Sequence, residues 1–170
     1  MKAISAAVIA ASMFSQPAIS QTKLGDWLYQ TRAPFYAATV NDSGNYFGQW
    51  CDLEDRSCMY MVAMPTRCDD EESYPVLINS DTSSLSTTIV CKGKLSDSKL
   101  YRYAFGNFEQ IDVIARKATR IGIAIPLAGD QFKVIRFSLQ GAELSLTVMR
   151  AAADRAVPAQ DQRNTRDQRL

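Results

Sequence analysis

The four cysteines are the residues of this sequence whose type and spacing most clearly imply chemistry. Cys51, Cys58, Cys68 and Cys91 lie within one stretch and contain no Cys-x-x-Cys spacing. An even number of cysteines without the close spacing of a zinc site or a redox dithiol favours disulfide bonds. Four cysteines allow three connectivities, of which we expect Cys51 with Cys58 and Cys68 with Cys91.

The expected pairing rests on the polar loop 52–57, which separates two apolar, strand-like runs. Cysteines at the two ends of such a loop can face each other across a β-hairpin. From loop entropy we expect roughly 2 to 3 kcal/mol of stabilisation from the short ring and about 3 to 4 kcal/mol from the long one. Disulfides persist only in an oxidising compartment, so this interpretation requires export.

The first twenty residues have the organisation of a secretory signal peptide. A positive start at Lys2 precedes an apolar run from Ala3 to Phe14, and small residues stand at Ala18 and Ser20. This pattern predicts cleavage after Ser20. The apolar run of about twelve residues is too short for a permanent membrane helix. The cleavage point has no cysteine, so nothing there suggests a lipid anchor. We expect a periplasmic or secreted bacterial protein without a stable membrane anchor.

The sequence contains no histidine. Its absence removes the commonest general base and metal ligand, and with it every Ser-His or Cys-His nucleophile. No Gly-x-Ser-x-Gly, P-loop or Gly-x-Gly-x-x-Gly motif is present either. We therefore expect no catalytic residue, no metal and no cofactor. A pair of carboxylates acting on a glycan is the enzymatic alternative, with candidates Asp52, Glu54, Asp55 and the run 69–72.

Two groups of residues form the candidate interaction surface. Aromatic residues and methionine are enriched at interfaces but are equally ordinary in cores. The run 58–64 is apolar on both faces, which indicates either a strand covered on both sides or a methionine-rich binding surface. The acidic run lacks the spaced oxygen ligands and turn glycine of an EF-hand loop. The candidate contact residues are Tyr46, Trp50, Tyr60, Met61, Asp69, Asp70, Glu71 and Glu72.

The total charge is balanced, with 19 basic and 18 acidic residues. Clustered positive charge is the usual mark of nucleic-acid binding, so the balance argues against a nucleic-acid partner. Acidic residues outnumber basic ones from Gln21 to Asp81, and basic residues outnumber acidic ones from Thr82 onward. A solvated face explains this polarity, although it could also steer a partner.

Hydrophobic periodicity predicts the elements of one domain, residues 21–153, followed by a disordered tail, 154–170. Period-two runs predict strands, while Asn107 and Gln110 resemble a capping box before a short amphipathic helix, Phe108 to Lys117. A second helix should run from Gly141 to about Ala152. The expected fold is α+β: a mostly antiparallel sheet or sandwich with one short helix and a C-terminal helix packed on it. The expected strands are 25–31, 35–40, 46–51, 58–64, 75–79, 85–91, 100–105, 120–125 and 132–139.

The layout of the chain resembles a family of bacterial envelope proteins. A signal peptide, Gly25-Asp26-Trp27, a cysteine-bearing β-rich middle, an aliphatic strand pair and then 137–141 before a helix are similar to invasion-associated locus B proteins. The closing part, from Asn107 to Ala153, also resembles periplasmic type VI secretion accessory proteins of the VasI type. The spacing of Cys51, Cys58 and Cys68 departs from both patterns. The resemblance implies a non-catalytic protein that works through contacts.

These observations favour an exported periplasmic binding or accessory protein with a protein partner in the envelope. One alternative is a periplasmic inhibitor or immunity protein that blocks a cell-wall hydrolase or a toxin with a disulfide-braced loop, because bracing lowers the entropy lost on binding. The other alternative is the carboxylate-based glycan enzyme described above.

Overall fold

The computed structural model describes residues 21–126 and 131–156 of the 170-residue chain. The predicted signal peptide and most of the predicted tail lie outside the described residues. The elements, in chain order, are β1 (Thr22–Leu24), β2 (Trp27–Gln30), β3 (Phe35–Val40), β4 (Tyr46–Asp52), β5 (Ser57–Met64), β6 (Ser73–Ser80), β7 (Ser84–Lys94), β8 (Tyr101–Phe105), α1 (Phe108–Lys117), β9 (Arg120–Pro126), β10 (Phe132–Ser138) and α2 (Ala142–Ala156).

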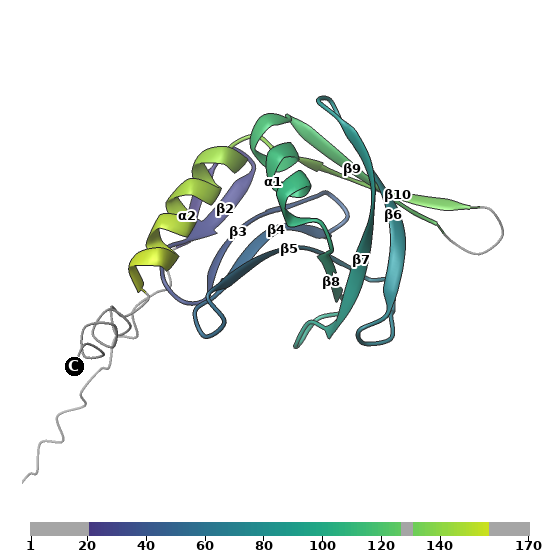
Figure 1. Ribbon diagram of the computed structural model, residues 1–170, viewed down its shortest axis with the longest axis horizontal. Coiled ribbons are helices and arrows are strands. Elements are labelled where there is room, and N and C mark those ends of the chain that lie inside the picture. Colours follow the sequence, from purple (N-terminus) through teal and green to yellow (C-terminus); the bar gives the residue numbers. More distant parts are fainter. Residues whose placement is uncertain (1–20, 127–130, 157–170) are drawn as a thin grey trace, which may run out of the picture.

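The described strands form a single sheet in the order β1-β2-β3-β4-β5-β8-β7-β6-β9-β10, and every neighbouring pair is antiparallel. The first five strands follow one another as a meander. The chain then crosses to β6 and returns through β7 to β8, which pairs with β5. The α+β fold expected from the sequence is confirmed (Figure 1).

Both helices pack on the same side of the sheet, α2 against β2 and β3 and α1 against β5, and they also touch each other (Figure 1). Asn107 caps α1 as predicted, because its side-chain oxygen accepts a hydrogen bond from the backbone N–H of Gln110. The buried faces of both helices and the facing strand residues make one hydrophobic core. Its largest fully buried side chains include Trp27, Phe47, Tyr60, Ile111, Ile114, Ile121, Ile123, Leu146 and Met149.

The sheet is rolled so that the end of β10 lies beside the turn between β1 and β2. The indole N–H of Trp27 donates to the carbonyl of Ser138 over 3.1 Å, and the backbone N–H of Asp26 donates to the carbonyl of Gln140 over 3.0 Å. Gly141 makes this close approach possible. It has φ +90°, and a Cβ there would lie 2.1 Å from the carbonyl oxygen of Leu24.

The two predicted disulfides are confirmed. Cys51 and Cys58 stand opposite each other in β4 and β5 and close the hairpin, while Cys68 in the β5–β6 loop bonds to Cys91 of β7. Cys91 is fully buried in the core. The sulfur of Cys51 also packs against the sulfur of Met149 at 3.5 Å, which ties the hairpin to α2.

The structure differs from the expectations at element ends. The strand expected from Gly25 to Thr31 is β2, Trp27–Gln30, and the sequence analysis did not expect β1, Thr22–Leu24, before it. Gly25, with φ +57°, turns the chain between the two strands. Helix α2 continues to Ala156, past the predicted domain boundary at Ala153, so the first residues assigned to the tail are helical. Residues 154–156 are exposed, so the last turn of α2 continues the helix without burying its side chains.

Candidate functional site

Strands β2 to β5 and β8 carry a hollow on the face opposite the helices, which we call the open face. Its volume is about 520 Å³. Each strand contributes the residues that alternate with its core residues, since successive side chains of a strand point to opposite faces. The lining residues are Gln21, Leu28, Tyr36, Ala38, Val40, Tyr46, Trp50, Met61, Ala63, Leu95 and Arg102.

Small residues form the floor of the open-face hollow. Ala38, Gly48 and Met61 lie in one cross-strand row, and the alanine and the glycine leave the middle of that row shallow. Ala38 is only 4% exposed although no helix covers this face among the described residues, because the larger side chains beside it shield it. Tyr36 and Trp50 form one wall, with their rings stacked at 6.3 Å.

The polar end of the hollow is formed by Arg102. One of its terminal nitrogens donates to the carbonyl of Lys92 over 2.8 Å. Its Nε is buried and has no hydrogen-bond partner among the described residues. A buried donor on a charged group normally has an acceptor, because leaving it unpaired costs about 1–3 kcal/mol or more. The hollow therefore combines apolar walls with one guanidinium at its polar end.

The phenol of Tyr36 adds a second polar group at the rim. Its oxygen accepts a hydrogen bond from the side-chain amide of Gln21. Burial raises the pKa of Tyr36, and the hydrogen bond from Gln21 only partly opposes that effect. The hydroxyl is thus neutral at physiological pH, and the rim carries no negative charge that would repel an acidic group from Arg102.

Three of the four predicted aromatic and methionine contact residues line this hollow: Tyr46, Trp50 and Met61. Tyr60 does not, because it alternates with Met61 along β5 and points to the helix side, where it is fully buried. The sequence analysis missed Tyr36 and Arg102. Only the register of the sheet, which pairs Tyr36 with Trp50, brings these residues to the same surface.

Tyr60 belongs instead to a polar cluster beneath the helices. Its hydroxyl donates to the carboxylate of Asp112 over 2.7 Å, and Arg150 pairs with the same carboxylate. The Nε of Arg150 donates to the side-chain oxygen of Gln49 over 2.6 Å, and its guanidinium lies 5.6 Å from the centre of the Phe108 ring. These contacts join α1 and α2 to β4 and β5, so the cluster fixes the helices on the sheet.

The protonation states of the cluster follow from burial and from these partners. Burial raises the pKa of Tyr60, and the hydrogen bond to Asp112 raises it further, so the phenol stays neutral. Burial would raise the pKa of Asp112, but hydrogen bonds from Arg150 and Tyr60 outweigh it and hold that pKa below its usual range. The cluster is thus a neutral donor and a partly buried ion pair between the helices and the sheet.

The acidic residues named in the sequence analysis lie away from the hollow lining. Glu71 forms an ion pair with Lys92 at 2.8 Å, and Glu72 accepts a hydrogen bond from the Tyr74 hydroxyl. Asp69 and Asp70 are exposed beside them, and so are Asp52 at the end of β4 and Glu54 and Asp55 in the β4–β5 turn. Residues 21–126 and 131–156 contain no cluster of side chains suited to hold a metal ion.

No protein-family model, curated protein or solved structure matches this chain. In the part of the chain that the structure describes, no helix is long and apolar enough to cross a membrane.

Proposed function

We propose that this chain is an exported, non-catalytic binding or accessory protein of the bacterial envelope, and that it acts by holding a partner protein in the open-face hollow. The observation that carries the proposal is the hollow itself: aromatic walls, a floor of small residues and a buried, unpartnered Nε on Arg102. Pockets of this kind, mostly apolar with a few convergent polar groups, are the usual form of a binding site.

The chemistry of the hollow indicates what the partner presents. Tyr36, Trp50 and Met61 offer apolar contact to an inserted aliphatic or aromatic side chain. The guanidinium of Arg102, which lines the hollow, offers a positive charge and N–H donors to a carbonyl or carboxylate oxygen. Aromatic anchors in a desolvated pocket typically dominate the energy of protein–protein contacts.

Export is the second part of the proposal. The signal-peptide pattern of the first twenty residues supports it, and so do the two disulfides, which need an oxidising compartment. Mass spectrometry of the protein from its native cells should therefore find a chain that starts at Gln21 with no free thiol. An intact Met1 or four free thiols would overturn this part.

The binding part is tested by site-specific photo-crosslinking in the cells that make the protein. A photoreactive residue replaces Tyr46 at the rim of the hollow or, as a matched control, Val113 on α1; both positions are exposed. We expect one crosslinked protein from position 46 and none of it from position 113. The Trp50→Ala variant should lose that product. Equal products from both positions, or a product that Trp50→Ala leaves unchanged, would contradict the proposal.

The inhibitor alternative involves a different surface, the β4–β5 turn. The Cys51–Cys58 disulfide closes this turn, and its tip is exposed and acidic at Glu54 and Asp55. A braced loop loses little entropy when it enters a cleft. A photoreactive residue at Glu54 distinguishes the two functions, because an inhibitor would crosslink to a hydrolase or toxin from position 54 and not from position 46.

A further inference from the structure

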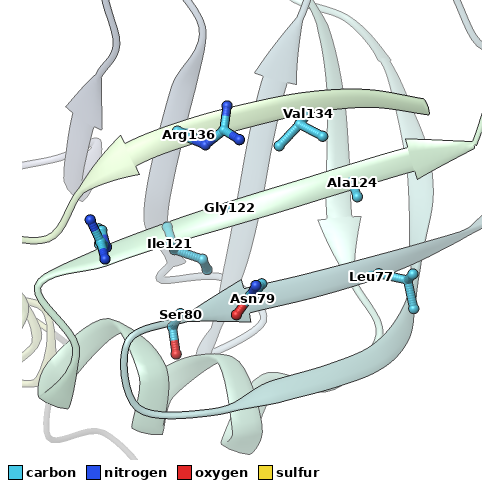
Figure 2. Close-up of a pocket in the computed structure, with 9 residues that line it drawn as sticks. Leu77, Asn79, Ser80, Ile121, Gly122, Ala124, Val134 and Arg136 are labelled. Carbon is cyan, nitrogen blue, oxygen red and sulfur yellow. The ribbon is translucent and has the colours of Figure 1, made fainter.

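A second hollow, of about 550 Å³, lies over β6, β9 and β10 and shares no lining residue with the open-face hollow. It is open to solvent, because Arg120, Gly122 and Ala124 of β9 alternate with the buried isoleucines 121, 123 and 125. We call it the arginine trough. Its lining residues are Leu77, Asn79, Ser80, Arg120, Ile121, Gly122, Ala124, Val134 and Arg136 (Figure 2).

The trough follows β9, the middle strand of the three. Gly122 stands between Asn79 of β6 and Arg136 of β10 in the register of the sheet, and Figure 2 shows the side chains of the two outer strands on either side of it. Strands lie about 4.8 Å apart, so the walls stand about 10 Å apart, and the floor from Arg120 to Ala124 is about 13 Å long. These dimensions fit one extended chain.

The two ends of the trough differ in chemistry. At one end Arg120 and Arg136 are exposed, and neither guanidinium makes a hydrogen bond or ion pair with any described residue. At the other end Leu77 is 52% exposed and Val134 is 45% exposed; Phe132, 60% exposed, continues the apolar surface along β10. The trough is thus cationic at one end and apolar at the other.

Two acidic side chains lie in this part of the sheet. Asp42 lines a neighbouring hollow with Arg136 but forms no ion pair with it, and Asp81 is already engaged. Its carboxylate accepts hydrogen bonds from the backbone N–H and the hydroxyl of Thr119, and from the backbone N–H of Arg120. The hydrogen bond from the Thr119 side chain is the main reason that the pKa of Asp81 lies below its usual range. Asp81 therefore holds the β6–β7 turn against the start of β9 and forms no ion pair with either arginine.

The floor decides between an acyl chain and a peptide. The backbone of β9 is paired with β6 on one side and β10 on the other, so the trough offers an incoming peptide no ladder of backbone hydrogen bonds. A peptide lying on Gly122 and Ala124 would bury its own amides without partners, which is costly, whereas an alkyl chain has no polar group to satisfy. Arginine is the residue best suited to bind a phosphate or carboxylate through paired hydrogen bonds.

We propose that the arginine trough binds one molecule of an anionic lipid, with its phosphate or carboxylate on Arg120 and Arg136 and its acyl chain along Gly122 and Ala124 toward Leu77 and Val134. This inference is independent of the proposed partner site. It adds a lipid-binding site to a chain for which the sequence favoured protein contacts.

The test uses the chain from Gln21 to Leu170 and dodecyl phosphate as the probe, titrated calorimetrically below its micellar concentration. Dodecyl maltoside has the same alkyl chain without the charge, and inorganic phosphate has the charge without the chain. We expect one dodecyl phosphate per chain, and binding of either control weaker by at least about tenfold, because each control lacks one of the two sets of contacts.

Two variants locate the site. Replacing both arginines, Arg120→Gln with Arg136→Gln, should weaken the binding of dodecyl phosphate by about tenfold to a hundredfold. The matched control pair, Lys23→Gln with Lys117→Gln, should leave this affinity unchanged. The Gly122→Leu variant should weaken dodecyl phosphate binding, because the leucine side chain would fill the floor of the trough. A Cβ at Gly122 would meet its nearest atoms at 3.6 Å and 4.0 Å, which is ordinary contact, so this variant should fold. Circular dichroism checks that it does.

Three outcomes would overturn the proposal: dodecyl maltoside binding as tightly as dodecyl phosphate, the double arginine variant binding as well as the parent, or an acidic peptide binding in the trough more tightly than dodecyl phosphate. Binding only to anionic vesicles, without uptake of the monomeric probe, would also overturn it, because it would assign the arginines to a membrane surface.

Discussion

The two faces of strands β4 and β5 have similar residues and opposite roles. On the helix side, Phe47 and Tyr60 are fully buried, and the ring of Phe47 contacts four other aromatic rings. On the open face, Tyr46 and Trp50 line a hollow that no described helix covers. An aromatic residue in this protein is therefore core or binding surface according to which of two alternating positions it occupies.

Polar groups on the two faces differ in their surroundings. On the helix side, Asp112, Arg150 and Tyr60 bond to one another, while the amide nitrogen of Gln49 and the hydroxyl of Ser145 are buried without a partner among the described residues. On the open face the Nε of Arg102 is also buried without a partner, but the Arg102 side chain lines the hollow. The helices cover the first group and no described helix covers Arg102. This difference in cover is the reason to place the stability of the protein on one face and its binding on the other.

The largest expected difference between the two faces is found by truncating two adjacent aromatic residues of β4, one on each face. Phe47→Ala should lower the free energy of unfolding by about 3–5 kcal/mol, because it opens a cavity in the core. Tyr46→Ala, at a position 37% exposed, should cost less than about 1 kcal/mol. Urea unfolding followed by circular dichroism measures both. Similar losses would show that both faces are core.

The two disulfides test the stability of the helix-side core, because both connect to it. Replacing Cys68 and Cys91 by alanine should cost about 3 kcal/mol, and replacing Cys51 and Cys58 about 2 kcal/mol, because the first pair closes the longer ring in the unfolded chain. The sequence separations are 23 and 7 residues. Thermal unfolding of the two double variants tests the order, and a reversed order would contradict the loop-entropy explanation.

Two glycines test how tightly the faces are packed. A Cβ at Gly48 would lie 2.3 Å from the carbonyl oxygen of Ala37, so Gly48→Ala must move the backbone and should cost about 1–3 kcal/mol. Gly122→Ala, in the arginine trough, meets nothing closer than 3.6 Å and should change stability by less than about 1 kcal/mol. The melting temperatures of the two variants give the comparison. If Gly122→Ala is the more damaging, the trough is not open.

The smallest expected effect on stability comes from substituting Asp112 in the polar cluster, and this effect depends on pH. The pKa of Asp112 is lower in the folded protein than in the unfolded chain, so its contribution to stability is present above the usual pKa of about 3.9 and is lost as the pH falls through the folded value. Asp112→Asn should cost about 1 kcal/mol at pH 7. Unfolding curves from pH 7 to pH 2 should show the difference from the parent narrowing below about pH 4. A constant difference would exclude a charged role for Asp112.

Much of the fold could be predicted because local rules agreed with the tertiary structure. Asn107 and Gln110 marked the start of α1, and the alternating isoleucines of 120–126 marked β9. The cysteine pairing followed from the polar turn between two strands. The strand order could not be predicted from the sequence, in particular the crossing from β5 to β6 and the return to β8. Strand order depends on long-range pairing, which leaves no local pattern.

The candidate site was only partly predictable for the same reason. Tyr46, Trp50 and Met61 were named from their residue types, but Tyr60 was placed with them although it alternates to the other face. Tyr36 and Arg102 were missed because they are distant in sequence and meet the others only through the sheet register. Residue type identifies what can bind, and register decides which residues bind together.

Nine of the ten described strands, both helices and the two disulfides could be predicted from local sequence, because side-chain periodicity, capping and loop chemistry act over a few neighbouring residues; β1 was the strand missed. Only the tertiary structure decided which face of the sheet the helices cover, and therefore that Phe47 is core while Tyr46 lines a hollow. The physical reason is that both faces of β4 and β5 are apolar. Burial is then settled by where α1 and α2 pack, and no local pattern in the strands specifies that side.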